Sequence, residues 1–200
     1  MQQVALLLRS YADDFHYAKR LVESFHEHNV SGLTLYIVVS DNDFELFSEL
    51  AAPYVEILRD THFSPYFTTT DVSGIRPGYI NQEIVKLSFW ELGLTENYFC
   101  VDSDAVFIRD FDESDFLASD GYPFSILVED KELKVESRYY TEHWVSRDES
   151  LRRIADEVGL KEDVLLTCHG HQVFSSQVLH AFRDRFLAPR GWDYLDALTV

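Results

Sequence analysis

The stretch Val4-Ala5-Leu6-Leu7-Leu8, followed directly by Arg9-Ser10-Tyr11, decides the fold class of this chain. An uninterrupted apolar run of this length predicts a β-strand that is covered on both faces, as the strands of a parallel sheet are. The polar triplet after it is the predicted exit of that strand from the sheet.

Helix and strand patterns alternate along the residues that follow. A helix is predicted after Asp13-Asp14, because apolar residues recur with helical spacing at Phe15, Ala18, Leu21, Val22 and Phe25. A second strand is predicted over Leu33 to Val39, then a short helix ending at Leu50, then a third strand over Tyr54 to Leu58. This order predicts an α/β fold with a mostly parallel sheet, right-handed crossovers and helices on both faces.

The middle of the chain adds a loop, a helix and a strand. Residues Thr61 to Tyr79 are rich in Ser, Thr, Gly and Pro and predict a long loop, which in a compact domain is usually functional. An amphipathic helix is predicted from Ile80 to Leu92, with Gly93 ending it. Tyr98 to Val101 predict a short buried strand that stops at Asp102-Ser103-Asp104.

We divide the domain into two parts at residue 128. The first part, 1–128, holds the alternating pattern and ends in a predicted strand over Phe124 to Val128. The second part, 129–200, is charged and mostly helical up to Asp163, and a last helix is predicted from about Ser176. Its apolar ending, Gly191 to Val200, fits either a packed C-terminus or truncation of a longer protein.

The charge balance excludes several classes of partner. The chain has 17 Lys and Arg against 35 Asp and Glu, which gives a net charge of −18. Nucleic acids and anionic membrane surfaces are repelled by such a chain, so we expect neither as a general partner. No apolar run approaches the length of a membrane span. A small anionic ligand is still compatible with this charge, especially if a metal ion accompanies it.

The two cysteines, Cys100 and Cys168, are not part of a Cys-x-x-Cys motif. This usage favours a reducing compartment over a disulfide framework or a zinc knuckle. The apolar run near the N-terminus is too short for the core of a signal peptide, and no basic residue precedes it. We therefore expect a cytoplasmic protein.

The strongest chemical signal is Asp102-Ser103-Asp104 at the end of a predicted buried strand. In open α/β sheets the carboxyl ends of the strands line the crevice that binds ligands. Carboxylate oxygens suit Mg²⁺ or Mn²⁺, which can bridge a diphosphate. The alternative is a turn with two solvated aspartates, but a buried strand end rarely carries two charges without a partner.

A second signal comes from the predicted helix before this strand. Gln82 and Lys86 are four residues apart and share one face of that helix. Lys86 near the Asp-x-Asp motif would neutralise a phosphate as a point charge. The alternative, a solvated Lys86 paired with Glu83 or Asn81, is favoured by spacing alone.

A third signal is the exit of the first strand. Arg9, Ser10 and Tyr11 supply a guanidinium, a hydroxyl and an aromatic ring at the carboxyl end of that strand. These groups suit a nucleoside diphosphate bound in the crevice of the sheet. Asp43 follows the second strand at the matching position and is a candidate to read a ribose or a base. The alternative is helix capping by aspartates, namely Asp13, Asp14 and Asp43. A dinucleotide GxGxxG motif and a Walker A lysine loop are both absent from the sequence.

The chain resembles GT-A-fold glycosyltransferases in four motifs taken together. These motifs are strand–Arg-Ser-Tyr, strand–Ser-Asp-x-Asp, Gly-Tyr-x-x-Gln-x-x-x-Lys-Leu and strand–Asp-Ser-Asp. The pattern is most similar to the glycosyltransferase-like proteins found among bacterial surface-polysaccharide genes, and it covers about residues 4 to 110 well. The resemblance implies a GT-A-like fold, with a nucleotide-sugar-binding part at 1–128 and an acceptor-side part at 129–200. It also implies transfer of a sugar from a nucleoside-diphosphate sugar, with a uridine donor favoured, to a glycan or lipid-linked acceptor.

The same resemblance implies roles for particular residues. A divalent metal, Mn²⁺ or Mg²⁺, would bind Asp102 and Asp104, with a late histidine, His169 or His171, as a third ligand. The donor would contact the residues Arg9, Ser10, Tyr11, Asp43, Gln82, Lys86 and Ser103. An inverting member would also need a catalytic base, for which Glu129, Asp130, Glu132 and Glu142 are all candidates.

Two other readings use the same residues. Haloacid-dehalogenase-like phosphatases also place Asp-x-Asp after an apolar strand, and there Asp102 would be the nucleophile. Their motif normally lies on the first strand, whereas about a hundred residues precede it here. A non-catalytic module in which the acids only bind an ion or cap a turn is the third reading.

Overall fold

The structure of the chain is a computed structural model that describes residues 2–125, 127–128, 152–156, 159, 167–168 and 171–199. The chain forms two compact units, one of Met1–Phe124 with Gly170–Val200 and the other of Ser125–His169. The predicted helical stretch from Glu129 to Asp163 lies largely outside the described residues. The second unit contributes a short antiparallel pair, β5 (Leu127–Val128) with β6 (Thr167–Cys168).

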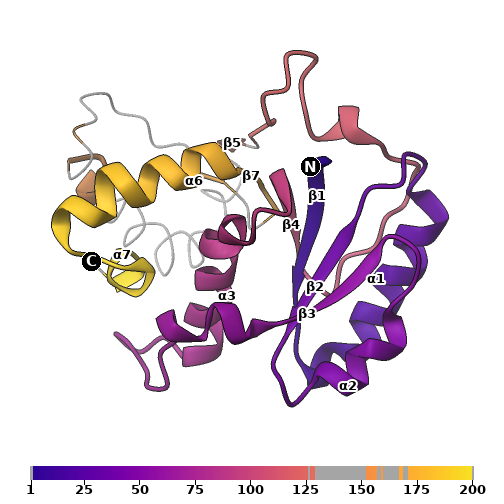
Figure 1. The fold of residues 1–200 in the computed structure, drawn as a ribbon, viewed down its shortest axis with the longest axis horizontal. Coiled ribbons are helices and arrows are strands. Elements are labelled where there is room, and N and C mark those ends of the chain that lie inside the picture. The colour runs from indigo at the N-terminus through magenta and orange to yellow at the C-terminus, as the bar shows by residue number, and fades with distance from the viewer. Residues whose placement is uncertain are drawn as a thin grey trace, which may run out of the picture. The chain divides into compact units, whose positions relative to one another are not determined.

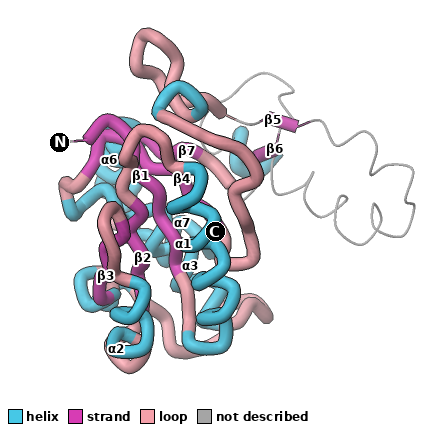
Figure 2. Tube along the Cα trace, turned by 90° about the vertical axis from the view of Figure 1, so that its right-hand side faces the viewer, coloured by secondary structure: helices cyan, strands magenta, loops and turns pink. Residues whose placement is uncertain are grey.

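The first unit is built on a five-stranded sheet in the order β3-β2-β1-β4-β7. Its strands are β1 (Gln2–Arg9), β2 (Leu35–Val39), β3 (Val55–Arg59), β4 (Thr95–Val101) and β7 (Val173–Ser175). The first four run parallel, while β7 pairs antiparallel with β4 at the edge (Figure 2). The predicted α/β fold with a mostly parallel sheet is therefore confirmed.

The strand order changes direction between β1 and β4. The chain proceeds from β1 outward to β2 and β3, and then returns to place β4 on the other side of β1. Leu8 of β1 lies opposite Val101 of β4, so both strands end at the same level of the sheet. A reversal of this kind opens a crevice at the carboxyl ends of the two central strands.

Helices cover both faces of the sheet (Figure 1). On one face, α1 (Phe15–His28) and α2 (Phe44–Phe47) pack on inward-facing residues such as Leu6 and Ile37. On the other face, α3 (Pro77–Ser88) packs on the alternate residues, among them Leu7 and Tyr98. Since both sets of residues in β1 are fully buried, its continuous apolar run has the structural role expected of it.

The predicted loop over Thr61 to Tyr79 is more structured than its composition suggests. It contains 3-10 turns at Asp60–His62 and Ser64–Tyr66, and α3 already begins at Pro77. The amide group of Asn81 in α3 binds both the backbone N–H and the carbonyl of Thr68, at 2.9 and 3.0 Å. Proline at the first position of a helix accounts for the early start, because its fixed φ suits the helix and its missing N–H is not needed there.

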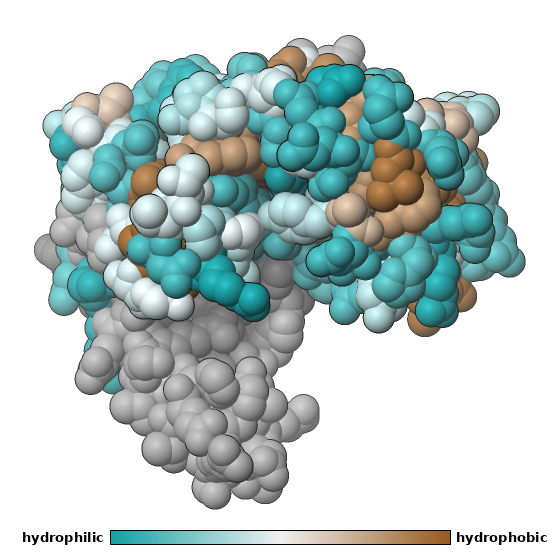
Figure 3. All heavy atoms as spheres, turned by 90° about the horizontal axis from the view of Figure 1, so that it is seen from below, coloured by the Kyte–Doolittle hydropathy of each residue, from teal (hydrophilic) through white to brown (hydrophobic). Residues whose placement is uncertain are grey.

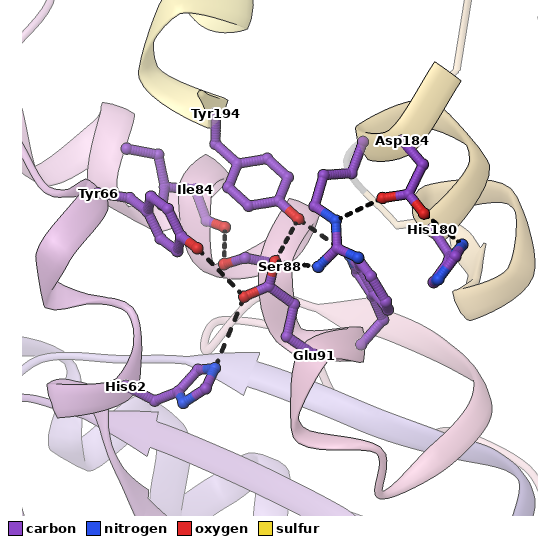
Figure 4. Close-up of polar contacts among 10 residues, drawn as sticks. His62, Tyr66, Ile84, Ser88, Glu91, His180, Asp184 and Tyr194 are labelled. Atoms are coloured by element: carbon purple, nitrogen blue, oxygen red, sulfur yellow. Dashed lines mark hydrogen bonds and ion pairs between the residues drawn. The ribbon is translucent and has the colours of Figure 1, made fainter. Parts of the chain in front are cut away.

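Of the two C-terminal helices, α7 (Tyr194–Thr199) packs beside α3, and α6 (Ser176–Phe182) packs against β4 and the 3-10 turn Phe89–Leu92. Ile80 and Ile84 of α3 share a buried cluster with Leu187 and Tyr194. Next to this cluster, the largely buried Glu91 accepts a 2.8 Å hydrogen bond from the Tyr194 hydroxyl and lies 3.4 Å from Nη1 of Arg183 (Figure 4). The C-terminal segment is thus fastened to the helix that carries Gln82 and Lys86.

Among the described residues, we find no helix that is long and apolar enough to cross a membrane.

Candidate functional site

A pocket of about 440 Å³ lies at the carboxyl ends of β1 and β4, where the strand order reverses. Figure 3 looks onto this end of the sheet, where much of the described surface is hydrophilic. The pocket is lined by residues from the exits of both strands, from α1 and its approach, and from α3: Arg9, Tyr11, Asp14, Tyr17, Gln82, Asp102, Ser103 and Asp104. Residues predicted from three separate sequence signals therefore meet in one place.

Asp102 is the centre of the polar contacts in this pocket. Its Oδ1 accepts a 3.3 Å hydrogen bond from the amide of Gln82 and lies 3.6 Å from Nζ of Lys86. Its Oδ2 lies 3.7 Å from Nε2 of His171, two residues before the first residue of β7. Asp102 is therefore a partnered carboxylate at a strand end, not an isolated solvated turn residue.

Lys86 is buried, contrary to the alternative of a solvated surface lysine. Its side chain is only 7% exposed, and its Nζ lies 3.1 Å from Oε1 of Glu83 as well as close to Asp102. Burial by itself lowers the pKa of Lys86, but the carboxylates of Glu83 and Asp102 outweigh this and leave the pKa above its usual value. Lys86 is thus a fixed positive charge behind the Asp-x-Asp motif.

His171 supplies an imidazole nitrogen to the same place. Its Nε2 atom is buried and has no hydrogen-bond partner, and its ring is inclined by 28° to that of Phe99, with the centroids 6.4 Å apart. Two carboxylates and an imidazole are suitable ligands for a divalent metal. In the described part of the chain, however, no three His, Cys, Asp or Glu side chains are gathered closely enough to form a metal site. The donor types fit a metal, while their present spacing is wider than a bound metal requires.

Arg9 also lines the pocket and is itself buried. Its Nη2 lies 2.8 Å from Oδ2 of Asp60, its Nη1 donates to the carbonyl of Val38 at 3.2 Å, and its Nε has no hydrogen-bond partner. The guanidinium lies 4.7 Å from the centroid of the Tyr11 ring. Burial raises the pKa of Asp60 above its usual value, although Arg9 offsets part of this effect.

Tyr11 links the pocket to the beginning of α3. Its hydroxyl donates a 2.9 Å hydrogen bond to the carbonyl of Gly78. This contact joins the exit of β1 to the structured segment that the sequence predicted as a loop. The rim of the pocket is therefore held by a hydrogen bond between residues 67 positions apart.

Four of the predicted ligand residues do not line the pocket: Lys86 and His171, which contact Asp102, and Ser10 and Asp43. Ser10 is fully buried, and its hydroxyl has no hydrogen-bond partner. Asp43 stands at the start of α2, where its backbone N–H bonds to Ser40. The alternative reading of capping aspartates is not seen either, because neither Asp14 nor Asp43 makes a side-chain capping hydrogen bond.

Sequence reasoning missed several residues of the site. Asp60, the partner of Arg9, follows the end of β3 and so obeys the same strand-exit rule that singled out the other candidates. Glu83 was considered only as a surface partner for Lys86, because spacing along a helix does not reveal how deeply a side chain is buried. Tyr17 reaches the pocket from α1 and had no distinguishing sequence signal. Of the two histidines considered, His169 lies outside the described residues.

A second pocket, of about 550 Å³, lies at the opposite end of the sheet. It is lined by residues at the amino ends of the strands, such as Gln3 and Thr95, and by none of the predicted site residues. Ligands of open α/β sheets bind at the carboxyl ends of the strands. The smaller pocket with Asp102 is therefore the better candidate for a functional site.

Comparison with known proteins places the chain in a family. No curated protein matches the sequence. A family described as "Family of unknown function (DUF6492)" matches residues 4–198, a range that includes every residue of the Asp102 pocket. The chain belongs to this family.

Proposed function

We propose that the protein is a metal-dependent glycosyltransferase of the GT-A type, which moves a sugar from a nucleoside-diphosphate sugar to an acceptor. The observation that carries this proposal is the pocket between β1 and β4, which Asp102 and Asp104 line together with Arg9 and Tyr11. An acidic pair at one strand end and an arginine with an aromatic ring at the neighbouring strand end suit the two halves of a nucleotide. A pocket of about 440 Å³ also has the size expected of a small-molecule site.

The charges of the pocket support a metal-bound diphosphate. Three of its described lining residues are acidic, namely Asp14, Asp102 and Asp104, while its lining cation Arg9 is already paired with Asp60. A diphosphate entering alone would be repelled by this balance. A dication would remove the repulsion, since the charge of a bound ion dominates its surroundings.

Asp102, Asp104 and His171 would hold this metal ion. The buried, unpartnered Nε2 of His171 beside Asp102 supports its inclusion in the ligand set. When bound, the metal would neutralise charge on the diphosphate leaving group. Lys86, held between Glu83 and Asp102, would add a fixed positive charge and keep the Asp102 carboxylate oriented.

The remaining residues of the pocket would position the donor. Gln82 would orient Asp102 through its amide, while Tyr11 and Arg9 would face the nucleoside from the exit of β1. Correct positioning of donor and acceptor accounts for a large part of the rate of such reactions. A uridine diphosphate sugar is the favoured donor, and the acceptor is a glycan or a lipid-linked molecule.

The experiment that tests this proposal measures release of nucleoside diphosphate from a panel of nucleotide sugars in the presence of Mn²⁺, with water as the default acceptor. We expect turnover with at least one donor, and a decrease of about 100-fold or more in Asp104→Asn, because loss of a charge-stabilising contact costs several kcal/mol in the transition state. Asp120→Asn, an exposed acid at the other pocket, is the matched control and should behave as wild type.

Two outcomes contradict the proposal. Near-wild-type turnover by Asp104→Asn would show that the Asp-x-Asp motif does not bind a metal ion needed for the reaction. Trapping of a beryllium fluoride adduct on Asp102 instead identifies an aspartyl-phosphate chemistry and favours the phosphatase reading.

A further inference from the structure

The larger pocket, of about 550 Å³, lies where the amino end of β4 extends beyond its edge strand. The central strand β1 pairs with β4 from Thr95 onward, whereas β7 pairs only with Asn97 to Phe99. After Ser175 the chain leaves the sheet and begins α6. On this side the first residues of β4 therefore border the pocket instead of a partner strand, and the pocket has the volume of a small-molecule site.

Asn97 brings a buried hydrogen-bond acceptor to this pocket. The residue lines the pocket and is only 6% exposed. Its Nδ2 donates a 3.0 Å hydrogen bond to the backbone carbonyl of Gln3, and this bond fixes which end of the amide carries the oxygen. The oxygen, Oδ1, accepts no hydrogen bond from any described residue. Because buried polar atoms normally have partners, this atom indicates a ligand that donates a hydrogen bond.

Two hydroxyl groups beside Asn97 are also left as acceptors. A hydroxyl has one proton to donate and two lone pairs. The Ser176 hydroxyl donates its proton to the backbone carbonyl of Thr95 at 3.0 Å. The Thr95 hydroxyl lies 2.8 Å from the backbone carbonyl of Asn97 and 3.0 Å from that of Gln2, so its proton is also used within the chain. The inner polar groups of the pocket, from Thr95, Asn97 and Ser176, thus accept hydrogen bonds but have none to give.

The charged groups of the pocket are carboxylates. Its described lining residues include Glu96 and Asp120 but no Lys, Arg or His. Within the described part of the chain Glu96 forms no ion pair, and Asp120 accepts only a 3.3 Å hydrogen bond from the backbone N–H of Tyr122. The Tyr122 ring also lines the pocket and is exposed. Carboxylates and the face of an aromatic ring both attract a cation.

We infer that this pocket is a second ligand site, and that it binds an organic cation through a primary ammonium group. An ammonium group has three donors and no acceptor, which matches inner groups that only accept. A sugar or another polyol would also need donors from the pocket, and an anion would meet two carboxylates. The site goes beyond the proposed function, since it shares no residue with the pocket of Asp102.

A bare metal ion fits this pocket less well. Among the described residues, no three His, Cys, Asp or Glu side chains are gathered closely enough to hold one. The volume of about 550 Å³ also suits an organic molecule of several carbon atoms. The ligand is therefore an amine with an aliphatic or cyclic body, whose ammonium group lies near Asn97 and the two carboxylates.

The test titrates the isotope-labelled whole chain, followed by NMR, with three six-carbon probes that differ in their end groups. The probes are hexamethylenediamine, hexamethylene glycol and adipate, and maltotriose is added as a neutral saccharide. An ionic strength of about 0.15 M limits general attraction to the negative chain. We expect the diamine to bind and to shift the side-chain amide resonances of Asn97, because a donor at Oδ1 polarises that amide. Glu96→Gln and Asp120→Asn together should weaken its binding about tenfold or more.

Glu23→Gln is the matched control, because Glu23 is an exposed acid on α1 and its replacement changes the net charge equally. Asp104→Asn should also bind the diamine as wild type does, so the result is independent of whether a nucleotide binds at the Asp102 pocket. The inference is overturned if Glu96→Gln weakens diamine binding no more than Glu23→Gln does, or if the Asn97 amide resonances do not move. It is also overturned if the glycol, adipate or maltotriose binds as tightly as the diamine.

Discussion

Nζ of Lys86 lies 3.6 Å from Oδ1 of Asp102, so a buried lysine stands directly behind the first carboxylate of the Asp-x-Asp motif. The two residues come from different elements, α3 and the exit of β4, and are brought together by the packing of α3 on the sheet. Oε1 of Glu83 lies 3.1 Å from the same Nζ atom, so one buried lysine pairs with two carboxylates. The lysine holds the Asp102 carboxylate and reduces the negative charge beside the pocket.

Replacing Lys86 with methionine keeps the length of the side chain but removes its charge. We expect this change to lower both the free energy of unfolding and the affinity for a diphosphate. Glu83 and Asp102 lose their shared partner, and since both are partly exposed, we expect a loss of about 1–2 kcal/mol in the free energy of unfolding. Binding of a diphosphate should weaken about tenfold or more, because the pocket becomes more negative. Urea unfolding and calorimetric titration measure the two effects, and Lys19→Met on the exposed side of α1 is the control. Unchanged diphosphate affinity in Lys86→Met would separate Lys86 from the ligand site.

Tyr194→Phe should loosen the C-terminal segment from α3. The Tyr194 hydroxyl donates to Glu91 at 2.8 Å and accepts from Nε1 of Trp90 at 3.2 Å, so its removal leaves two largely buried groups short of a partner. We expect a loss of about 1–3 kcal/mol, measured by urea unfolding. Tyr122→Phe, whose hydroxyl is exposed, should change the free energy of unfolding by less than about 0.5 kcal/mol. Equal stability of the two variants would show that the Glu91 contacts do not hold this segment.

Alanine variants at two glycines distinguish the stability lost to backbone strain from the stability lost to a steric clash. Gly32 and Gly93 both have left-handed φ angles, of 69° and 64°. A Cβ at Gly32 would lie 3.1 Å from the Tyr54 ring, whereas a Cβ at Gly93 would meet nothing within 4 Å. Gly93→Ala should therefore lose only about 1 kcal/mol from the strained φ, and Gly32→Ala should lose more than that. Thermal melting measures both, and a smaller loss in Gly32→Ala would show that Tyr54 moves freely out of the way.

The stability provided by Asp115 should depend on pH. A 2.6 Å contact with Nη2 of Arg109 and a hydrogen bond from the backbone N–H of Asp112 lower the pKa of Asp115 below its usual value of 3.8. A carboxyl whose pKa is lowered in the folded state stabilises the protein above its usual pKa, and this stabilisation is lost as the pH falls through the lowered value. Asp115→Asn should thus be less stable than wild type at pH 7, by at most about 1 kcal/mol given the partly exposed pair. The difference should shrink in melts as the pH falls below 3.8, and a difference that does not change with pH would show that packing, rather than the charge of Asp115, causes it.

Much of the fold could be predicted from local sequence patterns. The buried strand at Val4 to Leu8 and the helix with Ala18, Leu21 and Phe25 facing the core both follow from periodicity alone. The antiparallel pairing of β7 with β4 could not be predicted, because Val173–Ser175 is too short for a pattern and its direction is set by its partner strand. The helix at Pro77 began earlier than predicted, since its first turn is exposed and carries no apolar signal.

The residues of the site that could be predicted from the sequence are those that lie at the ends of strands. Asp102 and Arg9 were identified because residues directly after neighbouring parallel strands must converge. The pairing of Arg9 with Asp60 and the burial of Lys86 depend instead on how side chains pack between α3 and the sheet, which spacing along the chain does not encode. His171 reaches Asp102 only through the pairing of β7 with β4, which sequence patterns did not reveal.

The central claim is that a diphosphate and a divalent metal bind together beside Asp102 and Asp104. Thermal melting of the chain with uridine diphosphate, with Mn²⁺, with both, and with both plus a chelator tests it most directly. At a ligand concentration about one hundred times the dissociation constant, binding stabilises the folded state by roughly 2.7 kcal/mol. For a chain of this length we therefore expect the melting temperature to rise by roughly 5–10 °C with both ligands and by much less with either alone. If no nucleoside diphosphate raises the melting temperature in the presence of metal, the proposed function is contradicted. If a nucleoside diphosphate still raises the melting temperature after the chelator is added, the proposed metal dependence is contradicted.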